Sequence, residues 1–135
     1  MIFLHVTWTT KNRVDFLKDE KILKEIIEHI KLNAKRKGIM IDTINGAVDH
    51  IHVLILLSTS ETIARTIKLI KGESSWWIRR NITGLEDFSW QVGFDARPVT
   101  LDLLDTVRNY INNQKEHHSD KQNTPLQKEA SVNNP

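Results

Sequence analysis

The sequence predicts an α+β fold: a ferredoxin-like, RRM-like βαββαβ sandwich with an extra C-terminal helix. Some segments show the two-residue alternation of a strand, and others show the periodicity of a helix. Along the chain they follow the order strand, helix, strand, strand, helix, strand, helix. With 135 residues, the chain is long enough for one hydrophobic core and too short for two. We therefore expect a single domain over residues 1–118.

The first strand is expected from Ile2 to Thr10, where apolar and polar residues alternate and β-branched and aromatic types are frequent. The basic turn Lys11-Asn12-Arg13 follows it directly. Two interpretations of this turn remain open. Its cations, Lys11 and Arg13, either contact a nucleic-acid phosphate backbone or are ordinary solvated loop charges.

The first helix is expected to run from an N-cap at Asp19 to about Lys37, with Gly38 at its C-terminal stop. Apolar residues recur with helical spacing and should form the stripe that faces the core. This stripe consists of Ile22, Leu23, Ile26, Ile27, Ile30 and Leu32.

Two strands should follow, from Ile39 to Ala47 and from Val48 to Leu57, joined near Gly46 as an antiparallel hairpin. Alternation divides the second strand into two faces. One face carries Ile51, Val53, Ile55 and Leu57, and the other carries His50, His52, Leu54 and Leu56.

The two histidines of this strand therefore point in the same direction. His50 and His52 can share a divalent cation, because imidazole is a ready ligand and a strand holds both side chains nearly rigid. The alternative is that two polar residues merely mark where the strand leaves a turn. On this segment alone, both interpretations stay open.

A second helix should open at Ser58-Thr59-Ser60-Glu61 and continue to about Arg80. Its candidate core residues are Ile63, Ile67, Leu69, Ile70 and Trp77. Its other face is basic and could follow a phosphate backbone through Arg65, Lys68, Lys71, Arg79 and Arg80. Trp76 and Trp77 are either core residues, which we favour, or stacking surfaces for bases.

The last strand is expected around Phe88 to Val92, followed by an irregular segment from Asp95 to Pro98. A final helix, capped by Thr100 or Asp102, should continue to about His118. Residues 119–135 are polar and are expected to form a disordered tail.

Composition limits the partners and the chemistry. The absence of cysteine excludes disulfides and thiolate metal sites, so any metal must be bound through nitrogen and oxygen. A net charge of +2 permits a nucleic-acid partner without requiring one. The N-terminal residues lack the features of a signal peptide, and no apolar run approaches the length of a membrane span. We expect a soluble, cytoplasmic protein with no membrane partner.

The final helix adds a second set of reactive groups. Tyr110 and Gln114 are spaced i and i+4, which places them on one helix face. Tyrosine can form covalent intermediates, and a divalent cation at the histidine pair would polarise a phosphodiester for attack by its oxygen. Gln114 could add an oxygen ligand. Without the histidine pair, an ordinary surface tyrosine would be the preferred interpretation.

These residues resemble a known family. His50-Ile51-His52 is similar to the His-hydrophobic-His signature of HUH endonucleases, and the segment from Val107 to His118 resembles the tyrosine helix of their single-tyrosine branch. That branch comprises the transposases of small bacterial insertion sequences and the REP-associated tyrosine transposases. The segments from His5 to Arg13 and from Trp90 to Phe94 resemble further family blocks at corresponding places.

The resemblance implies a metal-dependent single-stranded DNA transposase that uses Mg²⁺ or Mn²⁺, needs no ATP, and forms a 5′-phosphotyrosine intermediate. It implies His50, His52 and Gln114 as metal ligands and Tyr110 as the nucleophile, with Asp49 orienting a ligand. The DNA would be a hairpin-forming end of an insertion sequence. A homodimer with shared active sites is also implied. The short segment before the final helix can project that helix away from its own sheet, and the helix is also free to lie across the open sheet face.

The chain departs from the family pattern at two places. Residues 93–100 read Gly-Phe-Asp-Ala-Arg-Pro-Val-Thr where the family commonly has Gly-Tyr-Gly-Ala-Phe-Ser-Val-Ser, and a polar tail begins at Ser119 where many relatives continue. The main alternative is a domesticated or decayed relative that binds hairpin or single-stranded nucleic acid without cutting. A histidine-triad hydrolase fits less well, since position 54 is leucine.

Overall fold

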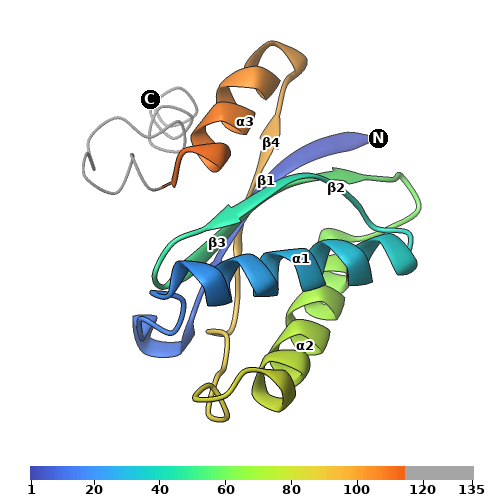
Figure 1. The fold of residues 1–135 in the computed structure, drawn as a ribbon. Helices are drawn as coiled ribbons and strands as arrows, with labels where there is room; N and C mark the ends of the chain where they lie inside the picture. Colours follow the sequence, from blue (N-terminus) through green and yellow to red (C-terminus); the bar gives the residue numbers. More distant parts are fainter. Residues whose placement is uncertain (115–135) are drawn as a thin grey trace.

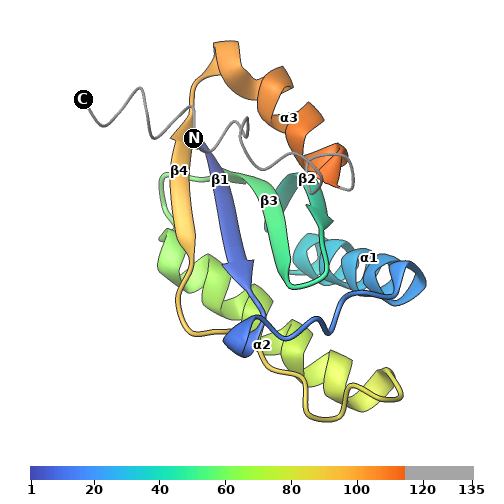
Figure 2. The same cartoon turned by 90° about the vertical axis from the view of Figure 1, so that its left-hand side faces the viewer.

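A four-stranded antiparallel sheet with the strand order β2-β3-β1-β4 forms the middle layer of the protein. The computed structural model describes residues 1–114. The strands are β1 (Ile2–Thr9), β2 (Met40–Gly46), β3 (His50–Leu57) and β4 (Asp95–Val99). Helices α1 (Glu20–Arg36) and α2 (Ile63–Asn81) cover one face, and α3 (Leu104–Asn112) lies on the other (Figures 1 and 2). The predicted α+β fold is confirmed, whereas the predicted tail and the last turn of the predicted final helix lie outside the described residues.

The main core lies between the sheet and helices α1 and α2. Alternation along β1 and β3 sends one set of apolar side chains toward the helices, as expected for half-buried strands. This core includes Val6, Trp8, Ile26, Ile30, Ile51, Val53, Ile55, Ile67, Ile70 and Ile78. The predicted division of the histidine strand into two faces is therefore confirmed, because Leu54 belongs to a second cluster beneath α3.

Helix α1 is capped as predicted by Asp19, whose Oδ1 accepts hydrogen bonds from the backbone N–H groups of Lys21 and Ile22 at 2.9 and 3.1 Å. Gly38 follows the helix with a φ of 73°, a conformation that glycine adopts without steric cost. Leu32 was expected in the apolar stripe but is 51% exposed. Two residues beyond Ile30 the helix has turned by roughly 200°, so Leu32 lies off the buried stripe.

Helix α2 starts later than predicted. Thr62, rather than the segment 58–61, caps it by accepting a hydrogen bond from the Arg65 N–H at 3.2 Å. Leu69 was expected in the core but is 40% exposed. It lies two residues beyond the buried Ile67, a rotation of roughly 200° around the helix, and therefore points away from the core. No helix within residues 1–114 is long and apolar enough to cross a membrane.

The predicted last strand is wrong. Residues 88–92 form a loop with a single bridge between Thr10 and Trp90, and the strand is instead β4, in the segment predicted to be irregular. Phe88 and Trp90 fill space beneath α2, where the Trp90 Nε1–H donates to Ser74 Oγ at 2.9 Å. Pro98 is tolerated in β4 because, within residues 1–114, this strand pairs only with β1 and forms an edge of the sheet.

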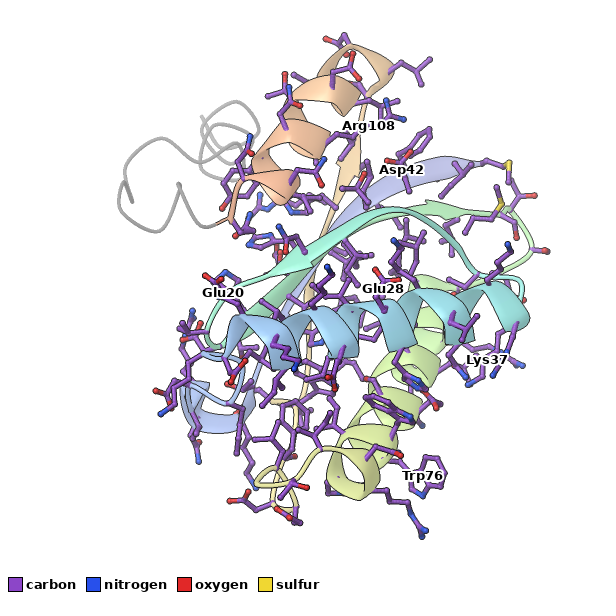
Figure 3. All side chains as sticks on the ribbon, in the orientation of Figure 1. Glu20, Glu28, Lys37, Asp42, Trp76 and Arg108 are labelled. Carbon is purple, nitrogen blue, oxygen red and sulfur yellow. The ribbon has the colours of Figure 1, made fainter. Side chains whose placement is uncertain are left out.

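Helix α3 packs on the open face of its own sheet. Leu104, Val107, Tyr110 and Ile111 are buried there in a second cluster with Leu54 and Val99. Arg108 of α3 also forms two hydrogen bonds with the carboxylate of Asp42 on β2, at 3.0 and 2.9 Å, and Figure 3 shows the two side chains meeting. Of the two placements expected for the final helix, the one across the open sheet face is confirmed. The one that projects away from the sheet is wrong, since β4 and a 3₁₀ turn (Leu101–Leu103) direct the helix back.

Candidate active site

The histidine pair lies on the sheet face that α3 covers. His50 and His52 are adjacent same-face residues of β3, and their side chains are largely buried. Their ring centroids are 5.0 Å apart and the ring planes meet at 78°. The strand thus holds two imidazoles close enough to act on one ligand.

Asp49 holds the first imidazole. Its Oδ1 lies 2.8 Å from His50 Nδ1, and its Oδ2 accepts a hydrogen bond from Arg13 Nε at 3.1 Å. Burial raises the pKa of the Asp49 carboxyl, but the hydrogen bonds from His50 and Arg13 outweigh burial and hold that pKa below its ordinary value. A carboxylate at this position keeps a proton on Nδ1 of His50, which leaves Nε2 with the lone pair.

The second imidazole is held by strand β1, through residues that sequence analysis did not assign to the site. His52 Nδ1 lies 2.9 Å from His5 Nε2 and 3.1 Å from Thr7 Oγ1. His5 is fully buried, and burial lowers its pKa to about 4, so this imidazole is neutral near pH 7. With Nδ1 engaged by β1, Nε2 is the other nitrogen of His52 and can act as a ligand.

A sequence signal for these two residues existed. His5 and Thr7 are same-face residues of β1, on the side opposite Val6 and Trp8. Thr7 is directly paired with His52 across the two strands. Alternation in the first strand, combined with an antiparallel pairing to the histidine strand, could have placed both residues on the histidine face.

Tyr110 lies against this cluster. Its ring centroid is 5.3 Å from that of His52, with an interplanar angle of 87°, and 6.1 Å from that of His5. Gln114 is almost fully buried one turn later, and its Nε2 donates to the Tyr110 carbonyl oxygen at 2.9 Å. The amide nitrogen is therefore engaged, and the amide oxygen is the atom of Gln114 that can bind a cation.

The donor set fits a divalent cation that accepts nitrogen and oxygen ligands. Two imidazole Nε2 atoms and one amide oxygen are neutral donors of the kind that such ions use. Within residues 1–114, no group of three or more histidine and carboxylate side chains could hold a metal by itself. A third ligand from these residues would have to come from another residue type, and the amide oxygen of Gln114 is a candidate.

The predicted DNA-binding cations divide into two groups. Lys11 and Arg13 lie in the turn beyond β1, near the Asp49 end of the site. The five cations of α2 lie on the opposite layer of the fold (Figure 1) and are not brought to the histidines. These are Arg65, Lys68, Lys71, Arg79 and Arg80.

Several of the α2 cations have partners within the protein. Lys71 Nζ donates to the carbonyl oxygens of residues 91 and 93, both at 2.7 Å, and burial lowers its pKa. The Arg80 guanidinium lies 4.9 Å from the ring centroid of Trp76, which is 49% exposed. The expected core position is thus wrong for Trp76, whereas Trp77 packs against the core and stacks on His29.

Comparison with known proteins agrees with this architecture. The sequence profile of a family described as "Transposase IS200 like" matches residues 1–114. A candidate transposase from Deinococcus radiodurans R1 has a similar structure, with a TM-score of 0.64, 24% identity, and coverage of 84% of this chain and 90% of that one. A REP-associated tyrosine transposase bound to a REP hairpin has a TM-score of 0.62 and 16% identity, with coverage of 87% of this chain and 68% of that one. No curated protein matches the sequence.

The two kinds of match support different statements. At these identities the solved structures establish the shared fold. The profile covers the four strands, the three helices and all the site residues described above, from His5 to Gln114. The chain therefore belongs to the IS200-like transposase family.

Proposed function

We propose that this protein cleaves and rejoins single-stranded DNA through a 5′-phosphotyrosine intermediate, in a reaction that depends on Mg²⁺ or Mn²⁺. The observation that carries the proposal is the packing of Tyr110 against His52, on the sheet face that also carries His50, with Gln114 hydrogen-bonded to the Tyr110 carbonyl oxygen. A nucleophile beside a nitrogen and oxygen donor set is the arrangement that metal-assisted phosphoryl transfer needs.

His50 and His52 would hold the cation through their Nε2 atoms, and Gln114 through its amide oxygen. When bound, the cation polarises the phosphodiester and stabilises the charge that develops on its oxygens. Asp49 orients His50, and the β1 pair His5 and Thr7 orients His52, because each engages the Nδ1 atom of its ligand.

Tyr110 would act as the nucleophile. Its phenolic oxygen loses a proton and forms a bond to phosphorus, while the bond from phosphorus to the 3′ oxygen breaks and that oxygen takes up a proton. The products are a 5′-phosphotyrosine link and a free 3′-OH. Attack of a 3′-OH on this link reverses the step and rejoins a strand, so no ATP is required.

In this proposal the site is assembled within one chain. Helix α3 lies on its own sheet, and Tyr110 contacts the histidine of the same chain. The implied homodimer stays a prediction, and in this arrangement each subunit of such a dimer would carry a whole site rather than half of two shared sites.

The proposed DNA partner is a single strand with a hairpin. One similar structure is a REP-associated tyrosine transposase bound to a REP hairpin, which supports a hairpin ligand here. Lys11 and Arg13 would contact the backbone near the site, while the α2 cations could bind only DNA that reaches the opposite layer.

End-labelled DNA tests this function. Purified protein is incubated with Mn²⁺ and single strands from the flanks of its own gene, labelled at either the 5′ or the 3′ end. A 5′-phosphotyrosine predicts a denaturation-resistant adduct that retains the 3′ label and releases the 5′-labelled fragment. Tight binding of the DNA without any adduct would instead mean that this protein binds single-stranded DNA and does not cut it.

A further inference from the structure

Strand β4 brings two charged residues to the face that carries the histidines and Tyr110. In the antiparallel pairing of β1 and β4, Asp95 lies opposite Thr7 and Arg97 opposite His5. Directly opposed residues of an antiparallel pair project on the same side of the sheet. Arg97 therefore lies beside His5, whose ring is 6.1 Å from that of Tyr110.

The guanidinium of Arg97 is anchored at one end and open at the other. Its Nε donates to Asp95 Oδ2 at 3.2 Å, and the Arg97 side chain is 31% exposed. Within residues 1–114, its two terminal nitrogens donate no hydrogen bond. Within residues 1–114 β4 is an edge strand, so a ligand that approaches along this edge can reach the partly exposed guanidinium of Arg97.

The other arginines near this face are placed or bonded differently. Arg13 lies in the turn beyond β1 rather than on the face itself, and its Nε donates to Asp49, which in turn orients His50. Arg108 is held by three hydrogen bonds from its guanidinium to the carboxylates of Asp42 and Asp105. Of the two arginines carried by β4 and α3, Arg97 is the one whose terminal nitrogens donate no hydrogen bond within the described part of the chain.

We propose that Arg97, oriented by Asp95, binds a phosphate of the DNA strand beside Tyr110 and so positions that strand for attack. This inference rests on the proposed function and adds a substrate contact on β4. The planar guanidinium matches two oxygens of a phosphate group, which a lysine ammonium at the same place would not.

The test measures DNA binding without cleavage. The Tyr110→Phe protein is titrated in EDTA with a single-stranded oligonucleotide that the wild-type protein binds, and fluorescence anisotropy gives Kd as a function of salt. Adding Arg97→Gln should weaken binding about tenfold and flatten the slope of log K against log salt by about 0.7, the value for one phosphate contact in a single strand. Arg97→Lys should recover part of the affinity.

A matched control removes an equal charge elsewhere. Arg36→Gln, on the exposed C-terminal turn of α1, should change neither Kd nor the salt slope. The phosphate itself can be located by replacing single phosphates with neutral methylphosphonates. A methylphosphonate at one position of the DNA should weaken binding to the protein that retains Arg97. The same replacement should cause no further loss of affinity in Arg97→Gln, because that variant already lacks the contact.

Equal affinity and equal salt slope for Arg97→Gln and Arg36→Gln would overturn the inference, as would a wild-type protein that binds no single strand. Thermal unfolding of each variant shows whether a loss of affinity is caused by misfolding. If Arg97→Gln is misfolded, Asp95→Asn provides a second test. It removes only the carboxylate that orients Arg97, and it should still lower the affinity for DNA. If the wild-type protein forms the adduct and Arg97→Gln binds DNA as tightly as its control, the role of Arg97 is contradicted and the proposed function is not. If Arg97→Gln binds more weakly but the wild-type protein forms no adduct, the proposed cleavage is contradicted and the role of Arg97 is not.

Discussion

The imidazole of His52 lies edge-on to the phenol ring of Tyr110, with 5.3 Å between the ring centroids. The two residues come from β3 and α3, which meet because the cluster around Leu54 and Val107 packs the helix onto the sheet. A tyrosine and a histidine of one chain are therefore held together without a partner subunit. The function proposed above depends on this contact.

Metal binding should follow the histidine pair. His50→Ala or His52→Ala should abolish measurable Mn²⁺ binding, whereas Gln114→Ala should weaken it less, because an amide oxygen is the more replaceable ligand. Asp49→Ala should cost roughly 10–100-fold in affinity, since it removes only the group that orients His50. Isothermal titration calorimetry measures each affinity directly.

His29 provides the control for that series. It lies on α1, in the opposite layer, and is hydrogen-bonded to Glu73. His29→Ala should leave Mn²⁺ binding unchanged. Mn²⁺ affinity that survives in the His50→Ala/His52→Ala double variant would show that the cation binds elsewhere.

The stability of the metal-free protein should fall in mild acid because of His5. Burial lowers its pKa from 6.5 to about 4, so the unfolded chain takes up a proton at a higher pH than the folded protein. The stabilisation is complete above pH 6.5 and is lost as the pH falls toward 4, by at most roughly 3 kcal/mol. Urea unfolding of wild-type and His5→Gln proteins across this range measures the difference. If the unfolding free energies of the two proteins changed with pH in parallel, the loss of stability in acid could not be assigned to His5.

Two glycines should respond in opposite directions to the same substitution. A Cβ on Gly46 would lie 2.7 Å from Ile51 Cδ1 and 2.9 Å from the His50 carbonyl oxygen. Gly46→Ala should therefore cost roughly 1–3 kcal/mol of unfolding free energy and weaken Mn²⁺ binding by displacing His50. Gly72 lies within α2 with no atom near an added Cβ, so Gly72→Ala should stabilise the protein by about 0.5–1 kcal/mol. Urea unfolding measures both, and a stabilising Gly46→Ala would refute the predicted clash.

Mixing two inactive proteins tests whether the site lies within one chain. Tyr110→Phe protein and His50→Ala/His52→Ala protein, tagged to different sizes and co-expressed, should form no adduct with DNA and Mn²⁺. Wild-type chains co-expressed with the histidine variant provide the positive control and should form the adduct only at the wild-type size. An adduct on the histidine-variant chain would mean that Tyr110 of one subunit works with the histidines of another.

The sequence predicted what depends on local periodicity. The two faces of β3 and the Asp19 cap follow from spacing along one element. The i, i+4 spacing likewise predicts that Gln114 lies next to Tyr110, although α3 itself ends at Asn112. Prediction from the sequence failed where tertiary packing overrides a local pattern. Residues 88–92 alternate like a strand, yet Phe88 and Trp90 are drawn beneath α2, and the edge of the sheet is filled by β4.

The missed site residues have a similar cause. His5 and Thr7 become site residues only because β1 pairs with β3 in a register that puts Thr7 opposite His52. The direction of α3 likewise depends on long-range contacts, such as the pair between Arg108 and Asp42, that no local pattern encodes.

The most direct test of the account identifies the residue that carries the DNA. The adduct formed with 3′-labelled single-stranded DNA and Mn²⁺ is digested with protease, and the nucleotide-bearing peptide is sequenced by mass spectrometry. The account predicts one modified residue, Tyr110, the only tyrosine of the chain, and no adduct from Tyr110→Phe protein that still binds the DNA. An adduct of undiminished yield from Tyr110→Phe protein would contradict it.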